Sequence, residues 1–149
     1  MKRVLFLCTG NSARSQMAEA LLRSIGDGKY EVMSAGTDIQ SEVNPFVIEV
    51  LEEKGIETDG LHTKSVERFT EEPIDLVITV CDKAKQTCPA FPGAKAMEHW
   101  SLEDPATFEG TYKEILAKFR ETRDEIEERI RKRLINPDPR IFGKMKLKL

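Results

Sequence analysis

A cysteine and an arginine six positions apart near the start of the chain could bind and attack an oxyanion. Cys8 and Arg14 enclose a short loop, and Ser15 follows it. The loop residues are Thr9, Gly10, Asn11, Ser12 and Ala13. A loop between a strand and a helix can turn its backbone N–H groups toward one point, and both Gly10 and Asn11 tolerate the positive φ that this requires. Arg14 offers a fork that matches a tetrahedral oxyanion, and the positive field would lower the pKa of Cys8.

The spacing alone is weak evidence, because Cys-x5-Arg can arise by chance in a chain with 3 cysteines. Its position between a strand pattern and a helix pattern, with Gly10 and Asn11 inside, makes it much stronger. The plainer alternative is that Cys8 is a buried structural thiol at a strand end. A Walker-type nucleotide loop is excluded, because the Gly-Lys-Ser/Thr sequence is missing.

Two further reactive residues, Cys81 and Asp104, also follow predicted strands, and Cys88 lies between those two strands. Cys81 comes directly after an apolar run at 75–80, Cys88 lies seven residues further on, and Asp104 follows a weaker strand pattern at 94–98. In open α/β sheets, ligands bind beyond the carboxyl ends of the strands. We therefore expect Cys81 and Asp104 near Cys8, with Asp104 able to protonate a leaving oxygen.

The elements that must position these residues alternate along the chain. Strands are predicted at 3–7, 30–34, 75–80 and 94–98, and helices at 12–25, 45–54 and 112–134. Asn44 is predicted to be the N-cap of the helix at 45–54. Thr111 and Glu114 have the spacing of a capping box at the start of the helix at 112–134. This alternation predicts an α/β fold with a parallel sheet covered by helices on both faces. We expect one catalytic domain at 1–135 and a C-terminal tail at 136–149.

Composition limits the other possibilities. The 149 residues are 40% hydrophobic with a net charge of −3, which is globular and argues against a nucleic-acid binder. No apolar run is long enough for a membrane span, and the apolar start is too short for a signal peptide, so a cytoplasmic protein is expected. Three cysteines do not make a disulfide framework, and His62 and His99 lack zinc-ligand spacing.

Residues 8–20 resemble the phosphate loop of the low-molecular-weight tyrosine phosphatase superfamily, and more closely that of the thioredoxin-coupled arsenate reductases with this fold. The resemblance covers residues 2 to about 130. It includes Ser34-Ala35-Gly36, Val43-Asn44-Pro45, Cys81, Cys88, Glu98-His99-Trp100 and Asp104-Pro105. It implies a four-stranded parallel sheet in the order 2-1-3-4. It also implies that Cys8 is the nucleophile, Arg14 the oxyanion clamp, Ser15 the partner of the thiolate and Asp104 the general acid.

The resemblance further implies a relay of three thiols. Cys8 attacks arsenate, Cys81 attacks Cys8 as arsenite leaves, and Cys88 attacks Cys81, giving a disulfide that thioredoxin reduces. A phosphatase acting on phosphate monoesters would need Cys8 alone, and a non-catalytic oxyanion-binding module is the third possibility. The expected partners are an oxyanion such as arsenate or phosphate and thioredoxin, with no nucleic acid or membrane, and the protein is expected to be a monomer.

Helix geometry adds a condition to the relay. Residues 82–88 should begin as a short helix, on which Cys81 and Cys88 would lie about 10 Å apart along the axis. A disulfide requires Cα atoms within about 7 Å, so the segment must unwind. Its polar composition and the following Pro89 should make this easy.

Three departures from relatives bear on the details. Ala13 replaces a second loop cysteine, which the relay does not need. Some reductases hold a potassium ion with an asparagine, a serine and an acid. Asn11 and Ser34 match, but Ser65 stands at the acidic position, which disfavours the ion, and we expect no other cofactor. In phosphatase relatives, aromatic residues that bind phosphotyrosine usually follow Asp-Pro directly. Here the first aromatic residue after Asp104-Pro105 is Phe108, which favours a small inorganic substrate.

Overall fold

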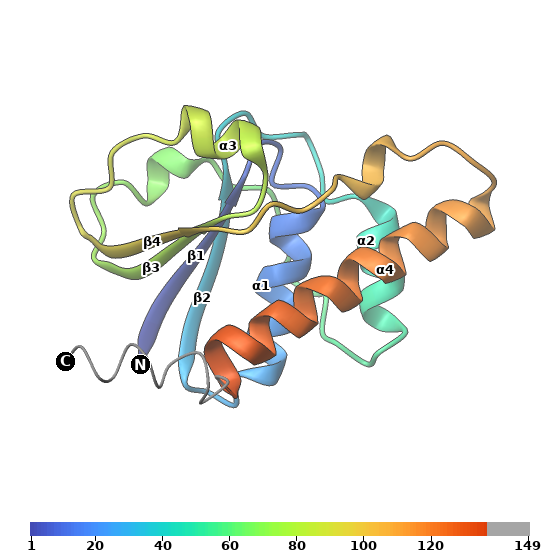
Figure 1. Cartoon of the computed structure of the whole chain (residues 1–149), viewed down its shortest axis with the longest axis horizontal. Coiled ribbons are helices and arrows are strands. Elements are labelled where there is room, and N and C mark those ends of the chain that lie inside the picture. The colour runs from blue at the N-terminus through green and yellow to red at the C-terminus, as the bar shows by residue number, and fades with distance from the viewer. Residues whose placement is uncertain (137–149) are drawn as a thin grey trace.

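The computed structural model describes residues 1–136 and contains one four-stranded sheet (Figure 1). Its strands are β1 (Lys2–Cys8), β2 (Tyr30–Gly36), β3 (Ile74–Thr79) and β4 (Ala94–His99). All pairs are parallel and the order is β2-β1-β3-β4, which confirms the predicted topology. Apart from residue 136, the predicted tail at 136–149 lies outside the described residues.

The register of the sheet brings the chemistry to one edge. Cys8 is paired with Gly36 of β2, Leu7 with Thr79 of β3, and Thr79 in turn with His99 of β4. The carboxyl ends of the four strands are therefore nearly level, and the segments that follow them start side by side. This places the loop after β1 next to the segment that begins at Cys81.

The helices cover the two faces of the sheet unequally. Helices α1 (Arg14–Ile25), α2 (Pro45–Glu52) and α4 (Tyr112–Ile130) pack against one another on one side, whereas the short α3 (Asp82–Thr87) contacts β1 and β3 from the other (Figure 1). Short 3₁₀ turns lie at Val66–Arg68 and Pro105–Thr107, and a π-helical segment, Arg131–Ile135, follows α4. No helix in the described part of the chain has both the length and the apolar character to cross a membrane.

The predicted caps are present. The side chain of Asn44 accepts a hydrogen bond from Phe46 N at 2.9 Å, which fixes the start of α2. Thr111 and Glu114 exchange the two hydrogen bonds of a capping box at the start of α4. Helix α1 begins at Arg14 rather than Ser12, because residues 9–13 are used to build the loop.

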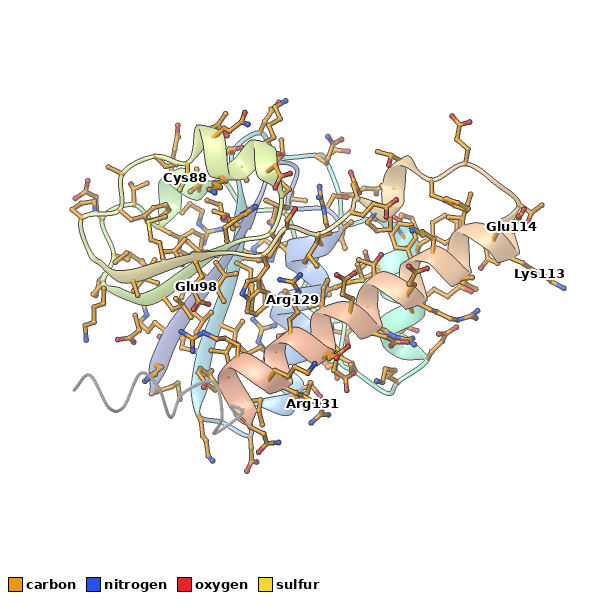
Figure 2. All side chains as sticks on the ribbon, in the orientation of Figure 1. Cys88, Glu98, Lys113, Glu114, Arg129 and Arg131 are labelled. Atoms are coloured by element: carbon orange, nitrogen blue, oxygen red, sulfur yellow. The ribbon has the colours of Figure 1, made fainter. Side chains whose placement is uncertain are left out.

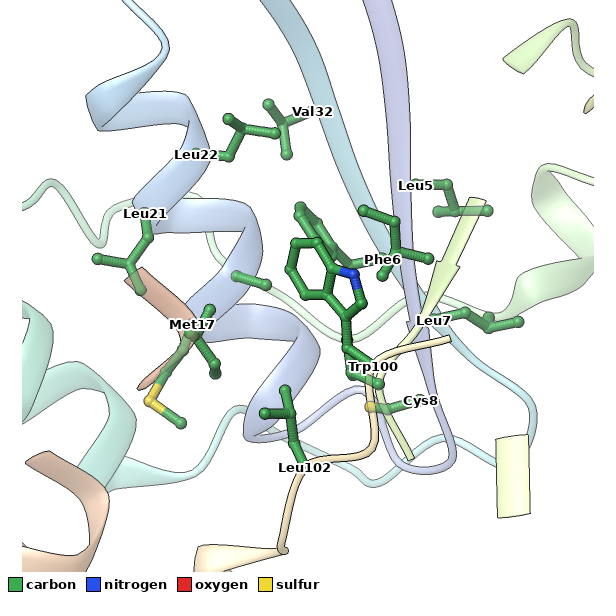
Figure 3. Close-up of a cluster of buried hydrophobic side chains, with 14 of the residues drawn as sticks. Leu5, Phe6, Leu7, Cys8, Met17, Leu21, Leu22, Val32, Trp100 and Leu102 are labelled. Atoms are coloured by element: carbon green, nitrogen blue, oxygen red, sulfur yellow. The ribbon is translucent and has the colours of Figure 1, made fainter. Parts of the chain in front are cut away.

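The main core lies between the sheet and α1 (Figure 3). Phe6 of β1 is fully buried there with Met17 and Leu21 of α1, and its ring packs against Trp100 with centroids 5.9 Å apart. Trp100 follows β4 directly, so this contact ties the edge strand to the centre of the sheet. Truncating Phe6 to alanine is expected to cost about 3–5 kcal/mol of the free energy of unfolding.

Candidate active site

The loop after β1 surrounds the sulfur of Cys8 with donors. Sγ of Cys8 is 2.8 Å from Oγ of Ser15 and accepts a hydrogen bond from Asn11 N at 3.1 Å. Asn11 has a φ of 51°, which makes it the left-handed residue of the loop. Gly10 does not need a positive φ, contrary to our expectation. A Cβ at Gly10 would instead lie 2.9 Å from Cγ of Gln40, so a larger residue here would force the exposed Gln40 side chain to move.

A second glycine allows the loop to sit close to the neighbouring strand. A Cβ at Gly36, the last residue of β2, would lie 2.5 Å from the carbonyl oxygen of Thr9. The loop backbone then follows the segment after β2, where Asp38 N donates to Thr9 O and Gln40 N donates to Gly10 O. Substituting Gly36 would therefore displace the loop that holds Cys8.

The ionisation of Cys8 is governed by two opposing effects. Cys8 is buried, and burial raises the pKa of its thiol above the ordinary value. The hydrogen bonds from Ser15 and Asn11 lower it in part. Arg14 does not contact the sulfur: its guanidinium donates to Leu102 O at 2.8 Å and lies 3.5 Å from Asp104. The lowered pKa expected from the loop sequence is therefore wrong for the packing seen here, because burial outweighs the nearby donors.

A buried polar network holds Asn11 in place. Its Nδ2 donates to Ser15 Oγ at 2.9 Å and to Ser34 Oγ at 3.0 Å, and its Oδ1 accepts from Lys64 N at 2.8 Å and Gln16 Nε2 at 3.0 Å. Asn11, Ser15, Gln16 and Ser34 are all fully buried. Every hydrogen-bonding atom of the Asn11 side chain thus has a protein partner, which stabilises the left-handed backbone beneath Cys8.

The same network bears on the potassium ion that the family resemblance raised. Ser34 Oγ donates to Glu19 at 2.6 Å, and Nζ of Lys64 lies 3.4 Å from the same Glu19 oxygen. Both Lys64 and Glu19 are buried, and burial lowers the pKa of the Lys64 ammonium while Glu19 raises it. The oxygens of Asn11, Ser34 and Glu19 are already paired, with an ammonium against the carboxylate. These residues therefore do not fit a potassium site.

The predicted acid and clamp share one cleft of about 310 Å³. Asp104 precedes the 3₁₀ turn Pro105–Thr107, and its Oδ1 accepts from Ala106 N at 3.0 Å, which leaves Oδ2 toward Arg14. The cleft is lined by Cys8, Thr9, Gly10, Ser12, Ala13, Arg14, Gln40, Asn44, Asp104 and Ala106. Asp104 and the loop residues thus meet, except that Asn11, which was expected to bind the substrate, is fully buried and does not line the cleft.

Three lining residues, Gln40, Asn44 and Ala106, were not foreseen as part of the site. Gln40 gave no sequence signal, because it reaches the cleft only through the pairing of its segment with the loop. Asn44 was identified as a helix cap, and the same residue also faces the cleft. Phe108 is not among the lining residues and is 38% exposed, so the wall past Asp104 is formed by Ala106.

The other two cysteines lie at the ends of α3, and all three cysteines are free thiols. Cys81 is the N-cap of α3: its Sγ accepts from Ala84 N at 3.3 Å and lies 3.3 Å from Oγ1 of Thr9 in the loop. Cys88 follows the last residue of α3, is half-buried, and is labelled beside that helix in Figure 2. Its Sγ is 3.4 Å from Pro89 O, and burial raises the pKa of its thiol. The predicted short helix between the two cysteines is thus present.

Comparison with known proteins agrees with this geometry. The sequence profile of the low molecular weight phosphotyrosine protein phosphatases matches residues 3–136. The chain belongs to this family. An arsenate reductase from Halalkalibacterium halodurans is 41% identical over 130 residues, which are 87% of this chain and 93% of that protein.

Solved structures give the same relationship. The structure described as an arsenate reductase in the phosphate binding state is 36% identical, with a TM-score of 0.75, and covers 87% of this chain and 94% of its own. A thioredoxin-dependent arsenate reductase from Corynebacterium glutamicum is 31% identical, with a TM-score of 0.64, over 100% of this chain and 64% of that one. This family member is therefore similar both to enzymes named for arsenate and to one named for its thioredoxin dependence.

Proposed function

We propose that this protein reduces arsenate to arsenite and is returned to its thiol form by thioredoxin. The observation that carries the proposal is the contact of Cys81 with Thr9 of the oxyanion loop, while Cys88 stands at the other end of the same short helix. Hydrolysis of a phosphate ester needs one thiol, whereas the reduction of arsenic needs two electrons, which a pair of thiols can supply by forming a disulfide. The arsenate reductases among the relatives support this assignment.

The first step joins arsenic to Cys8. The thiolate of Cys8 attacks arsenic, a hydroxyl group leaves, and a sulfur–arsenic(V) bond forms. Asp104 gives the departing oxygen its proton, so that it leaves as water. Arg14 and the loop N–H groups hold the remaining oxygens, with Arg14 turning from Asp104 and Leu102 toward the anion.

The second step transfers the electrons. The thiolate of Cys81 attacks the sulfur of Cys8, a Cys8–Cys81 disulfide forms, and the sulfur–arsenic bond breaks. The bonding pair stays on arsenic, which falls from the +5 to the +3 state and leaves as arsenite. Cys88 then attacks Cys81, releasing the thiolate of Cys8 and leaving a Cys81–Cys88 disulfide. The dithiol of thioredoxin reduces this disulfide and becomes oxidised itself.

Helix α3 must open for the last exchange. Its C-terminal half is exposed to solvent at Lys85, Gln86 and Thr87, and the hydrogen bond from Thr87 to Thr37 is long, at 3.4 Å. Cys88 has extended backbone angles and precedes Pro89, so the helix ends there. We infer that the Cys88 end moves toward Cys81, which brings the new disulfide to the surface where thioredoxin can reach it.

Hydrolysis of phosphate monoesters is the alternative, and the family as a whole is described by that activity. It would use Cys8, Arg14 and Asp104 in the same way and leave Cys81 and Cys88 unused. The cleft argues for the smaller substrate, because Gln40, Asn44 and Ala106 line it and no aromatic side chain within residues 1–136 does. An aryl phosphate would lack the stacking partner that such a substrate prefers.

A coupled assay tests the proposal. Arsenate-dependent oxidation of NADPH is measured with thioredoxin and thioredoxin reductase, beside hydrolysis of a chromogenic phosphate ester by the same preparation. We expect sustained arsenate turnover in the wild type and none in Cys88→Ser, with ester hydrolysis weak in both. Efficient ester hydrolysis without arsenate reduction would assign the protein to the phosphatases.

A further inference from the structure

The histidine at the end of β4 is bonded to the chain on both sides of Cys81. Nδ1 of His99 lies 2.7 Å from Oγ1 of Thr79, and Nε2 lies 2.7 Å from Oδ1 of Asp82. Thr79 is the last residue of β3, and Asp82 is the first residue of α3. The imidazole therefore spans the short connection in which Cys81 sits.

The protonation pattern of this bridge follows from its partners. A carboxylate can only accept, so Nε2 of His99 carries the proton given to Asp82, and Nδ1 pairs with the Thr79 hydroxyl. Ser101 adds a second hydrogen bond to the same Asp82 oxygen at 3.2 Å. His99 and Ser101 together hold the pKa of the Asp82 carboxyl below its usual range, so this group is ionised at neutral pH.

We propose that His99 is a positioning residue for Cys81, which it holds beside the oxyanion loop through its bonds to Thr79 and Asp82. This inference rests on the relay proposed above. In that relay the thiolate of Cys81 must attack the sulfur of Cys8. A misplacement of the attacking atom by about 1 Å can lower the rate of such a step by about 100-fold. The bridge fixes the Cys81 end of α3 to the sheet, so opening of the helix is confined to the Cys88 end. Cys81 then serves as a stationary acceptor for Cys88.

The test isolates the step that His99 is proposed to serve. In a Cys88→Ser background, one equivalent of arsenate is added, and the rate of Cys8–Cys81 bond formation is followed by acid quench, alkylation and peptide mapping. We expect His99→Ala to slow this bond by about 10- to 100-fold, with the affinity for phosphate unchanged because the oxyanion loop is intact. His99→Gln keeps a donor for Asp82 and should recover part of the rate.

A double-mutant cycle separates positioning from general stability. Asp82→Ala should give the same loss as His99→Ala, and the double variant should be no slower than either, because both substitutions remove one bridge. The Asp82 side chain is 71% exposed, so this variant folds even if His99→Ala does not. The matched control is Lys95→Ala, on β4 like His99. The Lys95 side chain is 78% exposed and paired with Asp75, so its removal should leave the rate of Cys8–Cys81 bond formation unchanged.

The outcomes are distinguishable from a failure of the relay itself. If the Cys88→Ser parent forms no Cys8–Cys81 bond, the relay is wrong, and this proposal falls with it. If the parent forms the bond, the relay stands. The positioning role is then overturned if both His99→Ala and Asp82→Ala match the parent rate within about twofold. It is also overturned if their separate losses multiply in the double variant.

Discussion

The guanidinium of Arg14 lies 3.5 Å from the carboxylate of Asp104 across the cleft that contains Cys8. The proposed clamp and the proposed acid are therefore in direct contact within the cleft. In the proposed reaction, an oxyanion bound by Arg14 would replace this ion pair and lie next to the Asp104 carboxyl group. This contact links binding of the substrate to the position of the acid.

Cys8→Ser should abolish both arsenate reduction and any phosphatase activity, because it removes the nucleophile. The change barely alters side-chain volume, so the thermal midpoint should move little. Activity assays combined with thermal unfolding check this. Turnover by the Cys8→Ser variant at a rate near that of the wild type would exclude the proposed chemistry for either reaction.

Asp104→Asn should lower the rate of arsenate reduction by about 10²–10⁴-fold, because an amide cannot protonate the leaving oxygen. Folding should be unaffected, since Oδ1 of asparagine can still accept from Ala106 N. Single-turnover kinetics are the appropriate measurement, because they exclude the later disulfide steps. A single-turnover rate equal to that of the wild type would assign the proton to another group.

Ser15→Ala should shift the pH dependence of Cys8 reactivity to higher pH. Burial raises the pKa of this thiol and the Ser15 hydrogen bond lowers it, so removing Ser15 raises the pKa further. The thiolate fraction, and with it the alkylation rate, then falls at neutral pH and recovers only as the pH rises. The measurement is the rate of Cys8 alkylation as a function of pH in a Cys81→Ser, Cys88→Ser background. The control is Ser24→Ala, because Ser24 lies on the same helix but is exposed. A profile that Ser15→Ala leaves unmoved, or that Ser24→Ala moves equally, would contradict the assignment.

Activity and thermal stability should be the same in potassium and sodium chloride at equal ionic strength. The reason is the buried pair of Lys64 and Glu19, in which an ammonium already lies against the carboxylate next to Ser34. The measurements are kcat/KM for arsenate and the Tm in the two salts. A rise of the Tm that is specific to potassium would show that the ion displaces Lys64.

Local patterns were sufficient to predict the strands, the helix caps and the loop. The apolar runs of β1 and β3 and the N-cap at Asn44 are each encoded within a few residues. The order of the strands came from the family resemblance, not from these patterns. The domain boundary at residue 135 stays a prediction.

Features that depend on packing between distant segments were not predictable. Gln40 reaches the cleft because its backbone pairs with Gly10, 30 positions away in the chain. The raised pKa of Cys8 follows from burial, which a loop sequence does not reveal. The bridge from His99 to Asp82 joins the ends of two elements that only the register of β3 and β4 brings together.

The central claim is the three-thiol relay, and the most direct measurement is the location of the disulfide after one turnover. Reduced protein is mixed with one equivalent of arsenate and no thioredoxin, quenched with acid, alkylated and mapped by mass spectrometry, with hydrogen exchange recorded over residues 82–90. For the wild type, the account predicts one equivalent of arsenite, a Cys81–Cys88 disulfide, a free Cys8 thiol and faster hydrogen exchange in α3. For Cys88→Ser, it predicts that the reaction stops at the Cys8–Cys81 disulfide. Arsenite released with Cys81 and Cys88 both still reduced would contradict it.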